Sequence, residues 1–208
     1  MTMDLIDAGN GQQRCGWPGA SDDYVQYHDE EWGVPVTGDV AFFERLTFEA
    51  FQSGLSWVTI MRRRPGFRQA FAGFDPDRVA EFGEADVARL MADAGIIRNQ
   101  AKIRATITNA QALRALRATD GDGAFERLIW SHRPTDRELQ NEGFVRPPQR
   151  LADLPASCKA SVALAKALKA RGFVFVGPTT LYAGMQANGL VDDHLEGCFR
   201  RGVAVIEA

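Results

Sequence analysis

Apolar residues recur every three to four positions along most of this chain, and no stretch sustains the alternating pattern of a half-buried strand. The segment over residues 39–54 shows this helical spacing in Phe42, Phe43, Leu46, Ala50 and Phe51. Asp39 is a suitable N-cap for such a helix, and Gly54 is a suitable stop. The spacing therefore predicts an all-α fold.

The same pattern, bounded by capping residues, predicts further helices along the chain. They cover residues 56–73 with an interruption at 64–66, then 75–82, 83–95, 99–116, a short helix before His132, 157–172 and 177–189. Asp75 and Pro76 suit an N-cap and a first helical position. Residues 133–155 are rich in proline and polar side chains, so they are predicted to form a long surface connection.

Length, charge and hydropathy limit the class of protein. We expect a poorly ordered segment over residues 1–13, a single helical domain of two packed lobes over 14–200, and a tail over 201–208. No run of apolar residues suits a membrane span, and the N-terminal residues do not have the pattern of a secretory signal. We therefore expect a cytoplasmic protein without a membrane partner. The net charge of −3 disfavours tight nonspecific binding to DNA, although a local patch is compatible with it.

Two of the three cysteines and two of the three histidines lie near the two ends of the chain. Three cysteines in a chain expected to stay reduced favour metal binding or inert burial over disulfides. Cys15 and His28 lie near one end, and His194 and Cys198, which would share a face if residues 191–198 were helical, lie near the other. Together they would suit a closed, structural zinc site. The alternative is hydrogen-bonded surface histidines and small buried cysteines, and we interpret Cys158 as such a structural cysteine.

An aromatic cluster and one carboxylate suggest a second site. Trp17, Tyr24, Tyr27, Trp32 and Trp57 all lie within the first 57 residues. Such residues usually pack in cores, but a cluster of them can also hold a planar base. Glu49 borders the apolar face of the helix over 39–54, where burial would raise its pKa unless a cation or hydrogen-bond donor meets it. The alternative is a surface ion pair between Arg45 and Glu49.

A short apolar connection between the last two predicted helices carries a possible phosphate site. In "ARGFVFVGPTTLYAGMQANG" the second helix begins directly after Gly177. Its first backbone N–H groups and the positive end of its dipole would suit an anion such as a DNA phosphate. The alternative is a plain helical hairpin with a glycine cap.

Four stretches resemble the DNA-3-methyladenine glycosylase I family of bacteria in sequence and in order. They are "RCGWPGASDDYVQYHDEEWGVPV", "FEAFQSGLSWVTIMRRR", "DAGIIRNQAKIRATITNA" and "KARGFVFVGPTTLYAGMQANGLVDDHLEGC". The resemblance covers almost the whole chain, from about Arg14 to Cys198. It implies the helix-hairpin-helix DNA glycosylase fold, with Gly177 and Thr179 at DNA phosphates. It also implies one structural zinc ion that joins the N- and C-terminal regions through Cys15, His28, His194 and Cys198.

The resemblance also implies an activity and the residues that carry it. Glu49 and Tyr27 would read a flipped base by hydrogen bonds, and Tyr24, Trp57 and Trp17 would pack against it. Trp32 is interpreted as structural. The implied enzyme excises N3-methyladenine from alkylated double-stranded DNA, releasing free 3-methyladenine and leaving an abasic site. It is expected to be monofunctional, because "PTTLYAG" has no lysine at the position used for lyase chemistry.

Asp192 departs from the pattern of that family. The wider superfamily keeps a catalytic aspartate at this position, where this family commonly has asparagine, so an auxiliary role for Asp192 stays open. Two alternatives to the implied function also stay open: a glycosylase of the same superfamily with another lesion preference, and a non-catalytic helix-hairpin-helix module that binds DNA. We expect a monomer that associates with the bacterial nucleoid when it acts.

Overall fold

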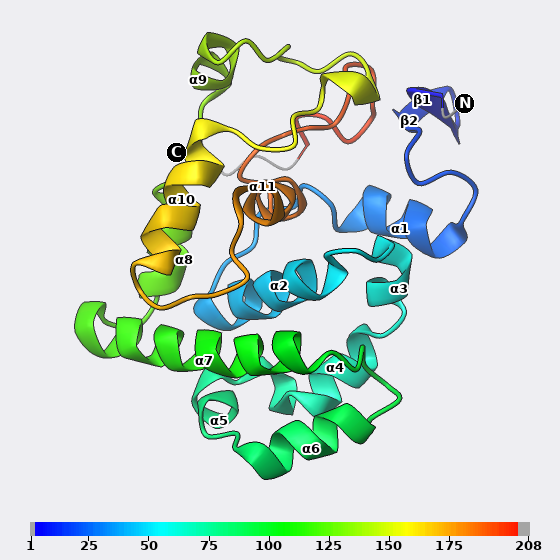
Figure 1. Ribbon diagram of the computed structural model, residues 1–208. Helices are drawn as coiled ribbons and strands as arrows, with labels where there is room; N and C mark the ends of the chain where they lie inside the picture. The colour runs from blue at the N-terminus through cyan, green and yellow to red at the C-terminus, as the bar shows by residue number, and fades with distance from the viewer. Residues whose placement is uncertain (1–2, 204–208) are drawn as a thin grey trace.

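A computed structural model describes residues 3–203 of the chain, and within them helices dominate (Figure 1). The α-helices are α1 (Asp22–Glu30), α2 (Asp39–Gln52), α3 (Trp57–Met61), α4 (Arg64–Ala70), α5 (Pro76–Ala80), α6 (Glu84–Ala92), α7 (Gln100–Asp120), α8 (Ala124–Trp130), α9 (Asp136–Asn141), α10 (Lys159–Lys169) and α11 (Pro178–Ala187). Short 3₁₀ turns lie at η1 (Ala72–Phe74) and η2 (Leu151–Asp153). The strands β1 (Leu5–Gly9) and β2 (Gln12–Cys15) form a small antiparallel sheet. No helix over residues 3–203 combines the length and apolarity needed to cross a membrane.

Helix α2 lies at the centre of the fold because most of its surface is apolar. It packs against α3, α7, α8 and α11, and Phe42, Phe43, Phe48 and Phe51 are almost completely buried. The N-cap of α2 is Gly38 with a φ of 88°, so the prediction that Asp39 caps this helix is wrong. The carboxylate of Asp39 instead accepts backbone hydrogen bonds from Gly123 and Glu126, at the start of α8. Asp39 therefore fixes α8 against α2.

Helix α7 crosses the molecule, with α4, α5 and α6 on one side of it in Figure 1. It begins at the predicted place because the side chain of Asn99 accepts a hydrogen bond from the backbone N–H of Lys102. It continues to Asp120, beyond the predicted end at residue 116. The buried side chain of Lys102 donates to the carbonyls of Phe51 and Ser53. This contact caps the C-terminal end of α2, where carbonyl groups would otherwise be unpaired.

Helices α10 and α11 are joined by a tight connection over residues 170–177. Phe173 and Val176 are buried there, whereas Val174 and Phe175 are exposed. Both backbone groups of Val174 bond to the side-chain amide of Asn109 on α7. Asn109 therefore fixes the connection to the body of the fold. Helix α11 also packs against α2, which places Gly184 beside Glu49.

The N-terminal segment differs from the expectation. Residues 5–15 form the β1–β2 hairpin. The prediction of a poorly ordered segment over residues 1–13 is therefore wrong for residues 5–13. Residues 1–2 lie outside the described part of the chain. The hairpin is held by segments distant in sequence: Asp4 accepts a hydrogen bond from the backbone of Leu151, and Gln13 accepts one from Phe199. A local pattern does not reveal such partners. Of the predicted tail over 201–208, residues 204–208 lie outside the described part.

Three other segments differ from the local predictions. Helix α1 forms where the sequence shows weak periodicity, and α9 forms within the predicted connection over residues 133–155. A reciprocal capping box between Thr135 and Glu138 starts α9. The chain over residues 191–198 is turn and irregular structure, so the helix considered for His194 and Cys198 does not form.

Candidate active site

A pocket of about 380 Å³ opens between α1, α2 and α11. All five residues predicted to form a base pocket line it: Trp17, Tyr24, Tyr27, Glu49 and Trp57. The wall also includes Trp32, which we interpreted as structural, and six residues that the sequence did not indicate: Gln52, Leu151, Leu154, Ala183, Gln186 and Ala187. The volume suits a ligand of small-molecule size.

The aromatic rings of the pocket hold one another in place. Trp17 packs edge to face against Tyr24 and Trp32, with ring centroids 4.9 and 5.2 Å apart. Tyr27 lies 5.4 Å from Trp57 at a tilt of 45°. The indole Nε1 of Trp57 is buried and has no hydrogen-bond partner among residues 3–203. A rigid aromatic wall of this kind suits a planar ligand.

Glu49 brings a buried carboxyl group to this aromatic wall. Its side chain projects from α2, and the residue is only 7% exposed. Burial raises the pKa of Glu49 to about 8, although the nearby positive charge of Arg45 opposes the shift. Burial and then the Glu49 carboxylate raise the pKa of Tyr27 well above its usual range, and that of Tyr24 also rises. The pocket is therefore suited to a cation, because a cation would favour the ionised form of Glu49.

Ion pairs behind the pocket explain why Glu49 is not a surface partner of Arg45. Arg45 pairs with Glu31 at 3.3 Å. Arg64 binds both carboxylate oxygens of Glu31 at 2.6 and 2.7 Å. The Arg64 guanidinium also lies 5.9 Å from the ring centroid of Tyr27. Since Arg45 pairs with Glu31 and Glu49 is buried, the alternative of a surface pair between Arg45 and Glu49 is wrong.

Gln186 on α11 is a polar wall residue with a fixed side chain. Its Nε2 donates to Oδ2 of Asp193 at 2.7 Å, and the same oxygen accepts a hydrogen bond from the Tyr182 hydroxyl at 2.8 Å. Asp193 is 1% exposed and also forms a buried ion pair with Arg146. The spacing of Ala183, Gln186 and Ala187 is the one signal in the sequence for this wall, because it places all three on one helical face.

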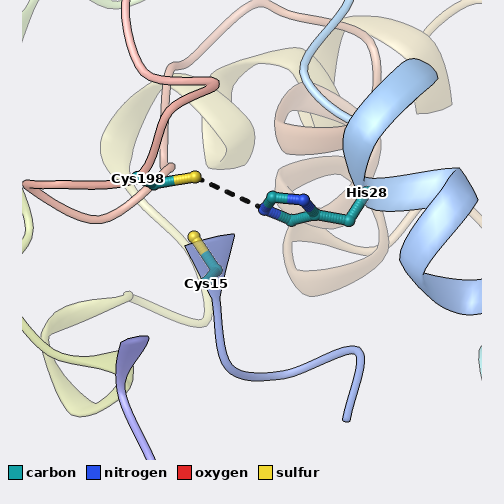
Figure 2. A group of neighbouring side chains, drawn as sticks. All are labelled: Cys15, His28 and Cys198. Atoms are coloured by element: carbon teal, nitrogen blue, oxygen red, sulfur yellow. Dashed lines mark hydrogen bonds between the residues drawn. The ribbon is translucent and has the colours of Figure 1, made fainter. Parts of the chain in front are cut away.

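Cys15, His28 and Cys198 form a buried group outside the pocket. Their ligand atoms lie within 4.8 Å of one another, and Figure 2 shows the two sulfurs and the imidazole facing a common region. Cys198 Sγ lies 3.6 Å from His28 Nε2. Hydrogen bonds with Cys15 and then His28 lower the pKa of the Cys198 thiol, whereas that of Cys15 is raised. β2, α1 and the C-terminal segment each supply one residue, so the group can hold a metal ion that joins both ends of the chain.

His194, the fourth predicted ligand, lies beside this group but is not one of the three. Its ring centroid is 5.1 Å from that of His28. Its Nε2 is buried and unpartnered among the described residues. Carboxylates hold the other nitrogen of each ring: Asp29 lies 2.7 Å from His28 Nδ1, and Asp192 lies 3.0 Å from His194 Nδ1. Carboxylates in this position are typical of the residues that orient metal-binding histidines, so the donor set fits a zinc ion.

Asp192 lies among the residues of this cluster, not among those that line the pocket. Its Oδ2 accepts a hydrogen bond from the backbone N–H of Gly202 at 2.9 Å. Burial opposes ionisation of Asp192, but the bonds from His194 and Gly202 outweigh it and lower the pKa. The structure therefore gives this carboxylate partners other than a bound base.

The predicted phosphate site lies at the N-terminus of α11. Gly177 is the N-cap of this helix and is half-buried, and Thr179 is exposed in the first turn. Pro178 occupies the first position, as predicted. The backbone N–H of Thr179 is among the first four N–H groups of the helix, which have no partner within it. This end of α11 is accordingly available to an anion.

Comparison with known proteins identifies the family. Residues 17–201 match the family model described as methyladenine glycosylase. The chain is 45% identical to DNA-3-methyladenine glycosylase 1 of Escherichia coli (strain K12), over 89% of this chain and 95% of the relative.

Solved structures agree with this match. A crystal structure of 3-methyladenine DNA glycosylase I superposes with a TM-score of 0.80 at 44% identity, covering 91% of this chain and all of the other. A Staphylococcus aureus structure that describes how 3-methyladenine is recognised has a TM-score of 0.80 at 30% identity, with 90% and 96% coverage. The chain belongs to the methyladenine glycosylase family.

Proposed function

We propose that this protein is a monofunctional DNA glycosylase that excises N3-methyladenine from alkylated double-stranded DNA. The observation that carries the proposal is the buried carboxyl of Glu49 within an aromatic pocket of about 380 Å³. Relatives named as 3-methyladenine glycosylases support the choice of base. The products are free 3-methyladenine and DNA with an abasic site.

The chemistry of the lesion explains why such a pocket is sufficient. Methylation at N3 leaves adenine with a positive charge, so the base is already a good leaving group. Water attacks C1′, the bond from C1′ to N9 breaks, and its electron pair neutralises the purine; the proton of the water passes to solvent. The enzyme has to extrude the nucleotide and select the cationic base.

The pocket residues have separate roles in this selection. Glu49 in its ionised form complements the cationic ring and accepts a hydrogen bond from the exocyclic amine. Tyr27 forms a second hydrogen bond to the base. The rings of Tyr24, Trp57 and Trp17 contact the electron-poor purine, which cation–π attraction favours. An ordinary adenine has no such charge and would leave Glu49 buried without compensation, which disfavours the undamaged base.

Two other parts of the protein have proposed roles, one in binding the DNA backbone and one in holding the fold together. The N-terminus of α11, with Gly177 and Thr179, binds a backbone phosphate near the flipped nucleotide. Cys15, His28, Cys198 and His194 hold one zinc ion, which ties the β1–β2 hairpin and α1 to the C-terminal segment. The ion has a structural role, since four protein ligands leave no open position. We place the protein in the cytoplasm, where its DNA substrate lies.

Release of free base from methylated DNA tests the proposal. Purified protein is incubated with DNA treated with a methylating agent, and released bases are separated by chromatography. Release of 3-methyladenine at a rate that rises with enzyme concentration supports the proposal. Release of another base in preference identifies a different lesion specificity. DNA binding without release of any base identifies a non-catalytic DNA-binding module.

A further inference from the structure

Helix α11 contributes three residues to the wall of the base pocket, and one of them is polar. Ala183 and Ala187 are small and apolar, whereas Gln186 carries a side-chain amide. An amide has both a donor, the NH₂ group, and an acceptor, the carbonyl oxygen. The contribution of α11 to ligand recognition therefore depends on which of these two groups Gln186 offers to the pocket.

Asp193 determines the orientation of this amide. Its Oδ2 accepts hydrogen bonds from Gln186 Nε2 at 2.7 Å and from the Tyr182 hydroxyl at 2.8 Å. Its Oδ1 pairs with Arg146. A carboxylate in such a pair can only accept hydrogen bonds, so an amide turned over would place its oxygen against a carboxylate oxygen. Nε2 of Gln186 must face Asp193, and the carbonyl oxygen Oε1 is the atom left for a ligand.

The Asp193 carboxylate is itself held by buried contacts. Its side chain has no exposed surface, and that of Arg146 is 2% exposed. Arg146 also donates to the carboxylate of Asp136 and to the backbone carbonyl of Asp192, each at 2.8 Å. Hydrogen bonds between charged groups are short and strong. This network fixes the Gln186 amide before a ligand binds, which lowers the entropy lost on binding.

The chemistry of the lesion indicates what a fixed acceptor would bind. In a flipped N3-methyladenine, the exocyclic amine carries all the N–H hydrogens, because N9 is bonded to the sugar and N3 to the methyl group. The amine has two hydrogens, and the bond proposed for Glu49 on α2 uses one of them. The other hydrogen needs an acceptor of its own, since a buried donor without a partner is costly.

We infer that Gln186 accepts a hydrogen bond from the exocyclic amine of the flipped base and thereby selects 6-aminopurines over 6-oxopurines, with Asp193 as the positioning residue that keeps the acceptor turned toward the base. The inference rests on the proposed function and adds a determinant of base specificity to it. A 6-oxopurine has an oxygen in place of the amine, so two acceptors would meet without a hydrogen between them.

The experiment compares the binding of two free bases, 3-methyladenine and 3-methylhypoxanthine, which has oxygen in place of the amine. The unmodified protein is expected to bind 3-methyladenine more tightly. Gln186→Met removes both amide groups at similar length and is expected to reduce this preference about tenfold or more. Gln111→Met is the matched control, because this glutamine lies on α7, outside the pocket, and donates to the Ala80 carbonyl. An unchanged preference in folded Gln186→Met overturns the inference.

Asp193→Asn tests the positioning role, because an asparagine can also donate and so lets the Gln186 amide turn over. The preference for 3-methyladenine is expected to fall, whereas general damage to the fold weakens binding of both bases equally. An unchanged preference overturns the role of Asp193.

Two measurements on the unmodified protein do not depend on the folding of these variants. A crystal structure with 3-methyladenine is expected to show Gln186 Oε1 within hydrogen-bond distance of the exocyclic nitrogen, and a longer separation overturns the inference. If methylated DNA releases no 3-methyladenine, the proposed function fails, while binding of the two free bases still tests Gln186.

Discussion

Oδ1 of Asp192 lies 3.0 Å from Nδ1 of His194, and Oδ2 of the same carboxylate accepts the backbone N–H of Gly202. Oδ1 of Asp192 therefore orients the His194 ring, while Oδ2 is held by the backbone of the C-terminal segment. His194 Nε2 is thereby left as the nitrogen free to bind a metal. Both oxygens of Asp192, for which an auxiliary catalytic role was left open, thus have partners outside the aromatic pocket.

We predict that Asp192→Asn has a mild effect on base excision. The amide oxygen still accepts one hydrogen bond, so kcat/KM should stay within about tenfold of the unmodified value. Zinc affinity should fall, because the amide orients His194 less strongly. Loss of a carboxylate that orients a metal-binding histidine typically costs about 10- to 100-fold in metal affinity. The measurements are single-turnover release of 3-methyladenine and competition with a zinc chelator. A loss of excision of about a hundredfold, roughly 2.7 kcal/mol, would instead make Asp192 a catalytic residue.

Glu49→Gln is predicted to lose excision while it keeps the fold. The amide has the shape of the carboxyl but no negative charge for a cationic base, so kcat/KM should fall about a hundredfold or more, in the range seen when a charged partner is lost. Helical circular dichroism and the unfolding midpoint report on the fold, and chromatography reports released base. Gln52→Ala is a suitable comparison on the same helix, since this half-buried wall residue has no charge. Near-normal turnover by Glu49→Gln would contradict the base-reading role.

The raised pKa of Glu49 predicts how stability depends on pH. Its carboxyl has an ordinary pKa of 4.5 and a folded-state pKa of about 8, so between these values the folded protein binds more protons than the unfolded chain. The contribution of this group to the free energy of unfolding is therefore present below about pH 4.5 and is lost as the pH rises toward 8. Urea unfolding of the unmodified protein and of Glu49→Gln should diverge over this window, with Glu49→Gln relatively more stable at pH 8. A constant difference between the two proteins would contradict the prediction.

Loss of the proposed zinc ion is predicted to destabilise the protein by separating its two ends. Cys198→Ala removes one ligand and should abolish stoichiometric zinc, as measured by elemental analysis. The expected loss of stability is about 3 kcal/mol or more, which lowers Tm by about 10 °C for a chain of this length. Cys158→Ala is the matched control, because Cys158 is equally buried but lies outside the group of three. Equal zinc in the unmodified protein and Cys198→Ala would rule out the proposed site.

Local sequence patterns predicted the elements whose signals are local. The helices predicted over 39–54, 75–82 and 177–189 are confirmed as Asp39–Gln52, Pro76–Ala80 and Pro178–Ala187, although Gly38 and not Asp39 caps the first of them. The β1–β2 hairpin was missed because its support comes from Leu151 and Phe199, far along the chain. Such contacts exist only after the chain has folded, so no window of sequence contains them.

The candidate site likewise combines residues that the sequence indicated with residues whose role depends on distant contacts. The sequence itself singled out Glu49 and the aromatic cluster, and the resemblance to a known family implied that they share one base pocket, where the structure brings them together. It did not indicate Gln186, whose side chain is fixed by a buried aspartate. Sequence gives the residue types that a reaction needs, whereas the contacts behind them arise from packing.

The connection over residues 170–177 leads to a prediction that separates DNA binding from base recognition. The side chain of Asn109 donates to the carbonyl of Val174 at 3.1 Å and accepts from its N–H at 2.8 Å. This pair of bonds fixes the segment that precedes Gly177 and the proposed phosphate site. Asn109→Leu breaks both bonds, so the segment becomes more mobile while the base pocket, which Asn109 does not line, is unchanged.

We therefore expect Asn109→Leu to weaken binding of an abasic duplex about five- to twentyfold, as loss of one or two net hydrogen bonds predicts. Binding of free 3-methyladenine, followed through the fluorescence of the pocket tryptophans, should not change. Thr106→Val is the matched control, because Thr106 is buried on the same helix and its hydroxyl donates to the Lys102 carbonyl within that helix. If duplex binding by Asn109→Leu equals that of the control, the α10–α11 connection does not hold the DNA backbone. If binding of free 3-methyladenine falls as well, the substitution has disturbed the pocket. The prediction that DNA binding and base recognition depend on separate parts of the fold is then wrong.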